Sequence, residues 1–111
     1  MTELHLSYRA ILKSDRSGAV TSVIAYEVQS TAPLRAVMWS APRKAWIYAP
    51  QQAGTFLRDP NYRERIRRIN RAEAEQIAQE SLLSPLPTEQ TLLEMLDEGQ
   101  AMGWDFGPPR Q

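Results

Sequence analysis

The pattern of apolar and polar residues in the first half of the chain is typical of β-strands. Apolar side chains recur at every second position over residues 4–12, with polar ones between them, and Ile11 alone breaks the alternation. This period of two predicts a half-buried strand. Residues 15–18 are predicted to form a turn, in which Gly18 supplies the positive φ that hairpin loops need. A second strand, rich in Val, Ile and Tyr, follows over residues 20–29.

Residues 35–49 predict a β-hairpin with a turn at residues 41–44. If Ser40 lies opposite Ala45, the hairpin has one aromatic and one aliphatic face. The aromatic face contains Val37, Trp39, Trp46 and Tyr48, and the aliphatic face contains Met38 and Ile47. When a strand pair is apolar on both faces, either the rest of the chain covers both faces, or it covers one face and a partner binds the other.

The middle of the chain predicts a short helix and a segment of ambiguous structure. Pro50 suits the first position of a helix that ends near Arg58. Residues 62–69 fit either a helix, because Ile66 and Ile69 are three apart, or a charged edge strand. We favour the edge strand, because edge strands tolerate charge and use it against aggregation.

Two amphipathic helices are predicted in the last third. Asn70 and Glu73 have the spacing of a capping box, which opens a helix to about Leu83, and Thr88 caps a helix to about Met102. Four or five strands followed by helices predict the α+β class. We therefore expect an antiparallel four- to five-stranded meander with the C-terminal helices packed on one face, the face of Met38 and Ile47.

Length and composition fit one domain. The chain has 111 residues, and we expect residues 1–103 to form a single α+β domain, followed by an irregular tail over residues 104–111. The sequence contains no cysteine, which excludes disulfides and thiolate metal sites. No apolar stretch approaches the roughly 18 residues that span a membrane, and the N-terminus lacks a signal-peptide pattern. These features together predict a cytoplasmic protein.

No pattern typical of a catalytic, cofactor or metal site is present. His5 is the only histidine and lies on the polar side of the first predicted strand. No nucleophile turn, phosphate-binding glycine loop or calcium-loop spacing accompanies it. Glu94, Asp97 and Glu98 share one helical face, as expected of a solvated face. We therefore expect a non-enzymatic protein without cofactor or metal.

Net charge is zero, but the charge is unevenly distributed. Residues 1–71 contain twelve cations and five acids, giving +7, and residues 72–105 contain eight acids and no cation, giving −8. Arg110 restores neutrality. The predicted acidic face of the last helix consists of Glu89, Glu94, Asp97 and Glu98. Such a face is either simply solvated beside a basic sheet edge, or it meets a basic partner.

Five arginines lie close together beside Tyr62, at Arg63, Arg65, Arg67, Arg68 and Arg71. They form either a charged edge strand that pairs with the acidic helices, or a surface that contacts the phosphates of a nucleic acid. As a strand, Arg63, Arg65 and Arg67 would share one side. The neutral overall charge and the acidic last third argue against nucleic acid, which we retain as the alternative function.

The order of these features resembles that of small bacterial immunity-type proteins, which inhibit secreted polymorphic toxins. The resemblance rests on Trp39, on the segments 46–50, 57–60 and 69–75, and on the helix start at residues 86–89. It implies a non-enzymatic inhibitor that occludes the active site of a cognate toxin, and it transfers no functional residues. We expect such a partner to be basic, steered by the acidic helix face.

The aromatic residues Trp39, Trp46 and Tyr48 are candidate anchors for the partner, because tryptophan and tyrosine carry interface energy. The competing interpretation is that these three side chains belong to the hydrophobic core. The solvent exposure of Trp39 and Trp46 distinguishes the two possibilities.

Overall fold

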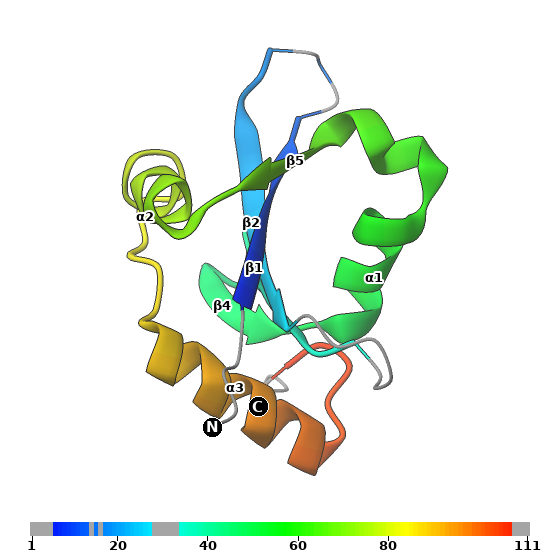
Figure 1. Cartoon of the computed structure of the whole chain (residues 1–111), viewed down its shortest axis with the longest axis vertical. Coiled ribbons are helices and arrows are strands. Elements are labelled where there is room, and N and C mark those ends of the chain that lie inside the picture. Colours follow the sequence, from blue (N-terminus) through cyan, green and yellow to red (C-terminus); the bar gives the residue numbers. More distant parts are fainter. Residues whose placement is uncertain (1–5, 14, 16, 28–33, 108–111) are drawn as a thin grey trace.

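The computed structural model describes residues 6–13, 15, 17–27 and 34–107. The elements in order are β1 (Leu6–Leu12), β2 (Val20–Glu27), β3 (Ala36–Ser40), β4 (Ala45–Tyr48), α1 (Pro50–Arg58), the 3-10 helix η1 (Pro60–Arg65), β5 (Ile66–Ile69), α2 (Arg71–Glu80) and α3 (Glu89–Met102). The strands form one five-stranded antiparallel sheet in the order β4-β3-β2-β1-β5. The predicted α+β class and meander are therefore confirmed (Figure 1).

The β3–β4 hairpin has the predicted register. Val37 lies opposite Tyr48, Trp39 opposite Trp46, and Ser40 opposite Ala45. Residues 41–44 form the turn, and Lys44 closes it with a φ of 53°. The alternation of side chains therefore places the two hairpin faces in two different environments.

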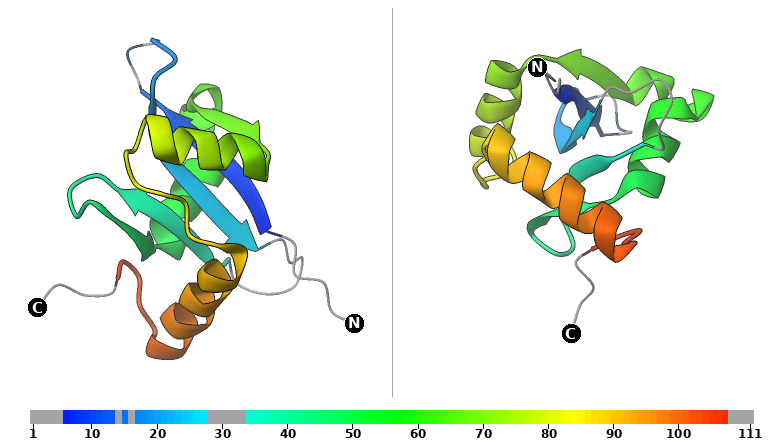
Figure 2. Two further views of the ribbon diagram at one scale, coloured as in Figure 1. Left: turned by 90° about the vertical axis from the view of Figure 1, so that its left-hand side faces the viewer. Right: turned by 60° about the horizontal axis from the view of Figure 1, so that its bottom comes forward.

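Helices cover both faces of the sheet (Figures 1 and 2). The core under α2 and α3 contains Val37 and Tyr48 together with Leu92 and Leu96 of α3. The core under α1 contains the hairpin's aliphatic pair, Met38 and Ile47, with Ala49 and Ala53. The expectation that the C-terminal helices cover the face of Met38 and Ile47 is therefore wrong. Because α1 starts only two residues after β4 ends, it takes that face and leaves the other to α2 and α3.

The strand predicted over residues 62–69 forms only in its second half, because residues up to Arg65 belong to the 3-10 helix η1. Asp59 opens η1, since its Oδ1 accepts a hydrogen bond of 2.9 Å from the backbone N–H of Asn61. The Tyr62 ring then packs against Phe56 of α1, with 4.7 Å between ring centroids. Only residues 66–69 join the sheet, where β5 pairs with β1 at the edge as predicted.

Both predicted caps are present, but α2 ends earlier than expected. The Asn70 side chain accepts from the Glu73 N–H at 2.8 Å, and the Glu73 carboxylate accepts from the Asn70 N–H at 3.1 Å. The Thr88 hydroxyl likewise accepts from the N–H of Thr91 at 3.1 Å. Helix α2 ends at Glu80, and the chain turns back through Leu83, whose φ is +55°.

Residues 104–107 pack against the sheet. Gly107 and Tyr48 exchange two backbone hydrogen bonds, of 2.8 and 3.0 Å, along the outer edge of β4. Trp104 is partly buried against the core under α3. Because these contacts pair part of the β4 edge, less of it remains open to other strands. Among the described residues, no helix has the length and apolar character needed to cross a membrane.

Candidate interaction surfaces

The aromatic face of the hairpin is core. Trp39 is 8% exposed and Tyr48 is 5% exposed. Trp46 is partly buried, its ring packs on Trp39 at 5.6 Å, and its indole Nε1 is buried without a hydrogen-bond partner. The hypothesis that these residues offer an aromatic surface to a partner is therefore wrong for the free protein, because α3 and the 104–107 segment lie over that face.

Arg35 ties the acidic helix α3 to the sheet. Its Nε donates to Glu27 Oε2 at 2.9 Å, and one terminal nitrogen donates to Asp97 Oδ1 at 2.8 Å and to Gln100 Oε1 at 2.9 Å. Burial lowers the pKa of Arg35, but hydrogen bonds to Glu27 and Asp97 outweigh it, so the pKa lies above its ordinary value. Asp97, predicted to be a contact residue, is therefore engaged within the fold.

Glu27 is the buried end of this network. The residue is 5% exposed, and its second oxygen, Oε1, is buried without a partner. Because an ionised carboxylate is costly to bury without a partner, the Arg35 guanidinium is needed to keep it stable beneath α3. The network therefore fixes the position of α3 on the sheet through Glu27, Arg35 and Asp97.

The outer face of α2, the linker over residues 81–88 and α3 forms a layer that we call the acidic layer (Figure 2). It carries the cation-free segment of the sequence, residues 72–105. Glu89, Glu94 and Glu98 are exposed and make no ion pair with any described residue. Glu94 and Glu98 are four apart on one helix, so their like charges repel each other. Three of the four predicted acidic residues therefore remain available for contact.

Two large apolar side chains are exposed in or beside the acidic layer. Leu83 in the linker is 82% exposed, and Met102 at the end of α3 is 63% exposed. Leu83 also has a positive φ, a conformation that costs a residue with a Cβ free energy and favours glycine. This exposure could not be predicted from the sequence, because the predicted helix extends to about Leu83 and an apolar residue at a helix end usually indicates core.

The five clustered arginines do not form one surface. Arg65 donates from Nε to the Leu12 carbonyl at 3.0 Å and lies over the Tyr62 ring. Arg71 donates to the Tyr8 hydroxyl at 3.0 Å and to the Pro87 carbonyl at 2.9 Å. Both side chains therefore hold the fold together.

The other three arginines of the cluster are exposed. They are Arg63, Arg67 and Arg68. Arg67 and Arg68 are neighbours on β5 and therefore point to opposite faces of the sheet. Within the described part of the chain, only Arg71 of the five forms an ion pair, at 3.5 Å with Glu75. The expectation that the arginines pair with the acidic helices is therefore largely wrong.

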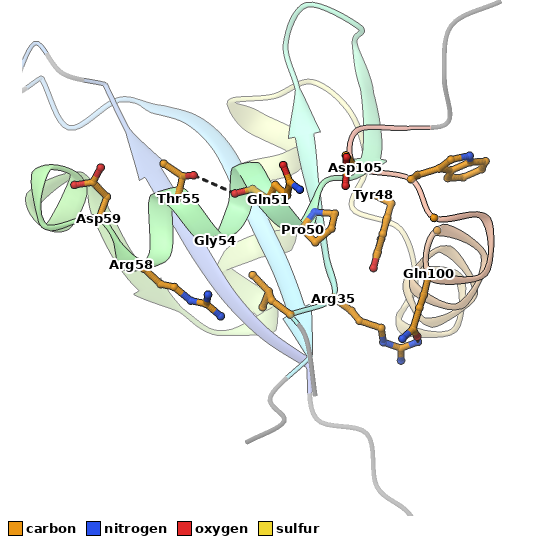
Figure 3. A pocket seen from close by; sticks show the side chains of 14 residues that line it. Arg35, Tyr48, Pro50, Gln51, Gly54, Thr55, Arg58, Asp59, Gln100 and Asp105 are labelled. Atoms are coloured by element: carbon orange, nitrogen blue, oxygen red, sulfur yellow. Dashed lines mark hydrogen bonds between the residues drawn. The ribbon is translucent and has the colours of Figure 1, made fainter. Parts of the chain in front are cut away.

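A cleft of about 900 Å³ separates α1 from the C-terminal end of α3 (Figure 3). Tyr48 and Arg35 line one part and Thr55 and Asp59 another, and the Thr55 hydroxyl donates to the Gln51 carbonyl at 3.1 Å. Burial is the main cause that raises the pKa of Tyr48 above its ordinary value, so the phenol stays protonated at neutral pH. The described residues contain no group of three or more His, Cys, Asp or Glu arranged to hold a metal ion, and His5 lies outside them.

In comparisons with known proteins, no family model, no curated protein and no solved structure matches this chain.

Proposed function

We propose that the chain is a non-enzymatic protein-interaction module that binds a basic protein through the acidic layer. The observation that supports this most is the exposed outer face of α3, where Glu94 and Glu98 repel each other and no described cation pairs with either. A basic partner relieves that repulsion. Long-range attraction between the two surfaces also speeds their encounter.

The exposed apolar residues of this layer supply the anchors. Leu83 is held in a costly backbone conformation with its side chain in water, and strain of this kind is concentrated at functional positions. Glu80 and Glu89 bracket the linker that carries Leu83. An apolar anchor flanked by carboxylates suits a partner with an apolar pocket rimmed by lysine and arginine.

In its most specific form, the proposal is that the chain acts in the cytoplasm as an immunity-type inhibitor of a cognate toxin. The resemblance in the order of elements supports this form, as does the charge of the acidic layer, because nuclease toxins carry basic substrate-binding surfaces. The inhibitor would cover that surface without performing chemistry of its own.

The direct test is binding to the product of the neighbouring gene, with charge-reversal variants of the chain. Glu94→Lys together with Glu98→Lys should weaken the equilibrium affinity about tenfold or more. For a one-to-one comparison, Glu94→Lys is matched by Glu64→Lys, which makes the same charge change at an exposed position on η1 that forms no ion pair with a described residue. The proposal is contradicted if Glu64→Lys weakens binding as much as Glu94→Lys. It is also contradicted if the neighbouring product does not bind at low salt.

A further inference from the structure

A second cleft, of about 480 Å³, lies between the sheet and the α1–η1 segment, away from the acidic layer. Three arginines from three different elements line it: Arg9 of β1, Arg58 of α1 and Arg63 of η1. We propose that this cleft binds the phosphate group of a small phosphorylated ligand of nucleotide size. The inference does not depend on the acidic layer or its partner.

No carboxylate neutralises these three arginines among the described residues. None of them takes part in an ion pair. Of the two acids that line the cleft, Glu27 forms an ion pair with Arg35, and Asp59 accepts the hydrogen bond that caps η1. Asp59 keeps its negative charge, but the three guanidinium groups outnumber it, so the concave site carries a net positive charge that attracts anions, and low-dielectric walls strengthen that attraction.

The Arg9 side chain is fixed in position. Its Nε donates to the Tyr26 hydroxyl at 3.1 Å, and the residue is only partly exposed. No described residue accepts a hydrogen bond from the terminal nitrogens of Arg9, so they can donate to a ligand. The Tyr26 oxygen acts as acceptor, so its own O–H proton remains available for an anion. Arg9 and Tyr26, which both line the cleft, thus offer an oriented set of donors.

A fourth arginine, Arg68, does not line the cleft but is the cross-strand neighbour of Arg9. Arg9 lies directly opposite Arg68 on the β1–β5 strand pair. Ile11 and Ile66 belong to the core under α1, so Arg9 and Arg68, each two residues away, project toward the α1 face as well. Like charges opposite each other on neighbouring strands are unfavourable, and a bound anion removes that cost.

The shape and lining of the cleft indicate the class of ligand. Its volume lies in the range of small-molecule sites, which is roughly 300–1,000 Å³. Arginine recognises phosphate through paired N–H donors. The remaining wall includes Phe56, Leu57 and Ile66, which suit an apolar or aromatic group attached to the phosphate. A nucleoside monophosphate combines these two parts.

The test is isothermal titration calorimetry at low salt with AMP, inorganic phosphate and a 5′-phosphorylated oligothymidylate as probes. Arg58→Gln and Arg63→Gln remove exposed side chains and should each weaken AMP binding about tenfold or more. Arg67→Gln is the matched control, because it removes the same charge from the opposite face of β5. It should leave AMP affinity unchanged, and inorganic phosphate should compete with AMP.

Two results would overturn the proposal. The first is the absence of AMP binding to the unaltered chain at low salt. The second is a combined result. Arg67→Gln would lose as much affinity for AMP as Arg63→Gln does, and the unaltered chain would bind the oligonucleotide far more tightly than AMP, with an affinity that salt strongly weakens. That combination would assign the arginines to a nucleic-acid backbone crossing the β5 edge instead.

Discussion

The ring of Tyr48 lies directly against the backbone of Gly99. A Cβ atom built at Gly99 would approach Cγ of Tyr48 to 2.2 Å, closer than any real contact. Gly99 belongs to the buried stripe of α3 with Leu92 and Leu96. The missing side chain therefore lets α3 approach β4 closely enough to bury the tyrosine, and it sets the position from which the acidic face of α3 is presented.

Gly99→Ala is expected to destabilise the fold by at least about 1–3 kcal/mol, because the added methyl group must displace the Tyr48 ring or the helix. Urea unfolding measures this change. Gly54→Ala is the control in α1, because its Cβ would meet Leu34 at an ordinary 3.5 Å. That variant should be neutral or up to about 1 kcal/mol more stable, since alanine favours helix. Equal effects at both positions would contradict the close packing of α3 on Tyr48.

Leu83→Gly is expected to stabilise the free protein by about 1 kcal/mol and to weaken partner binding at the same time. The first effect follows from relief of the positive φ, and the second from loss of the anchor. Leu83→Asn, which also tolerates this backbone conformation, should behave in the same way. Urea unfolding and partner titration measure the two effects. A variant that is more stable and still binds fully would remove Leu83 from the contact surface.

Arg35→Met should destabilise the protein by about 3 kcal/mol, because it leaves the Glu27 carboxylate buried without its cation. Adding Glu27→Gln should recover part of that loss, since the neutral amide costs less to bury. A double-mutant cycle by urea unfolding measures the coupling. Additive effects of the two changes would show that the pair does not interact as the structure indicates.

Stability should decline at alkaline pH because burial raises the pKa of Tyr48 in the folded state. The stability that the neutral Tyr48 phenol contributes is fully present below a pH of about 10, the pKa of tyrosine in the unfolded chain. It is lost as the pH rises through the higher pKa of Tyr48 in the folded protein. No described residue hydrogen-bonds to the Tyr48 hydroxyl, so Tyr48→Phe should be nearly neutral at pH 7 and should make the alkaline decline less steep. Some decline should persist, since burial also raises the pKa of Tyr8. An unchanged pH profile in Tyr48→Phe would contradict this assignment.

Local sequence patterns predicted the local structure well. The register of the β3–β4 hairpin, the Asn70–Glu73 capping box and the Thr88 cap each depend on residues close together in sequence, and all three are confirmed. Gly18 adopts the predicted positive φ, at +82°. The meander follows from the same short connections.

The tertiary packing of the helices could not be predicted in the same way. Alternation shows that Val37 and Met38 face opposite sides, but it does not show which side α3 covers. The Asp59 cap turned residues 60–65 into a 3-10 helix, and this moved Arg63 and Arg65 off the predicted strand.

Sequence reasoning also missed Arg9 and Arg58 as candidate site residues. They lie 49 positions apart in the sequence, and only the pairing of β5 with β1 and the path of α1 bring them to one cleft.

The association rate constant for the basic partner, measured by stopped flow over a range of ionic strength, tests the role of the acidic layer most directly. We predict a rate that falls steeply as salt rises, and a Glu94→Lys, Glu98→Lys variant whose rate is slower at low salt and much less salt-dependent. An association rate in the unaltered protein that is independent of salt, or a variant with the same salt dependence, would contradict binding through this face.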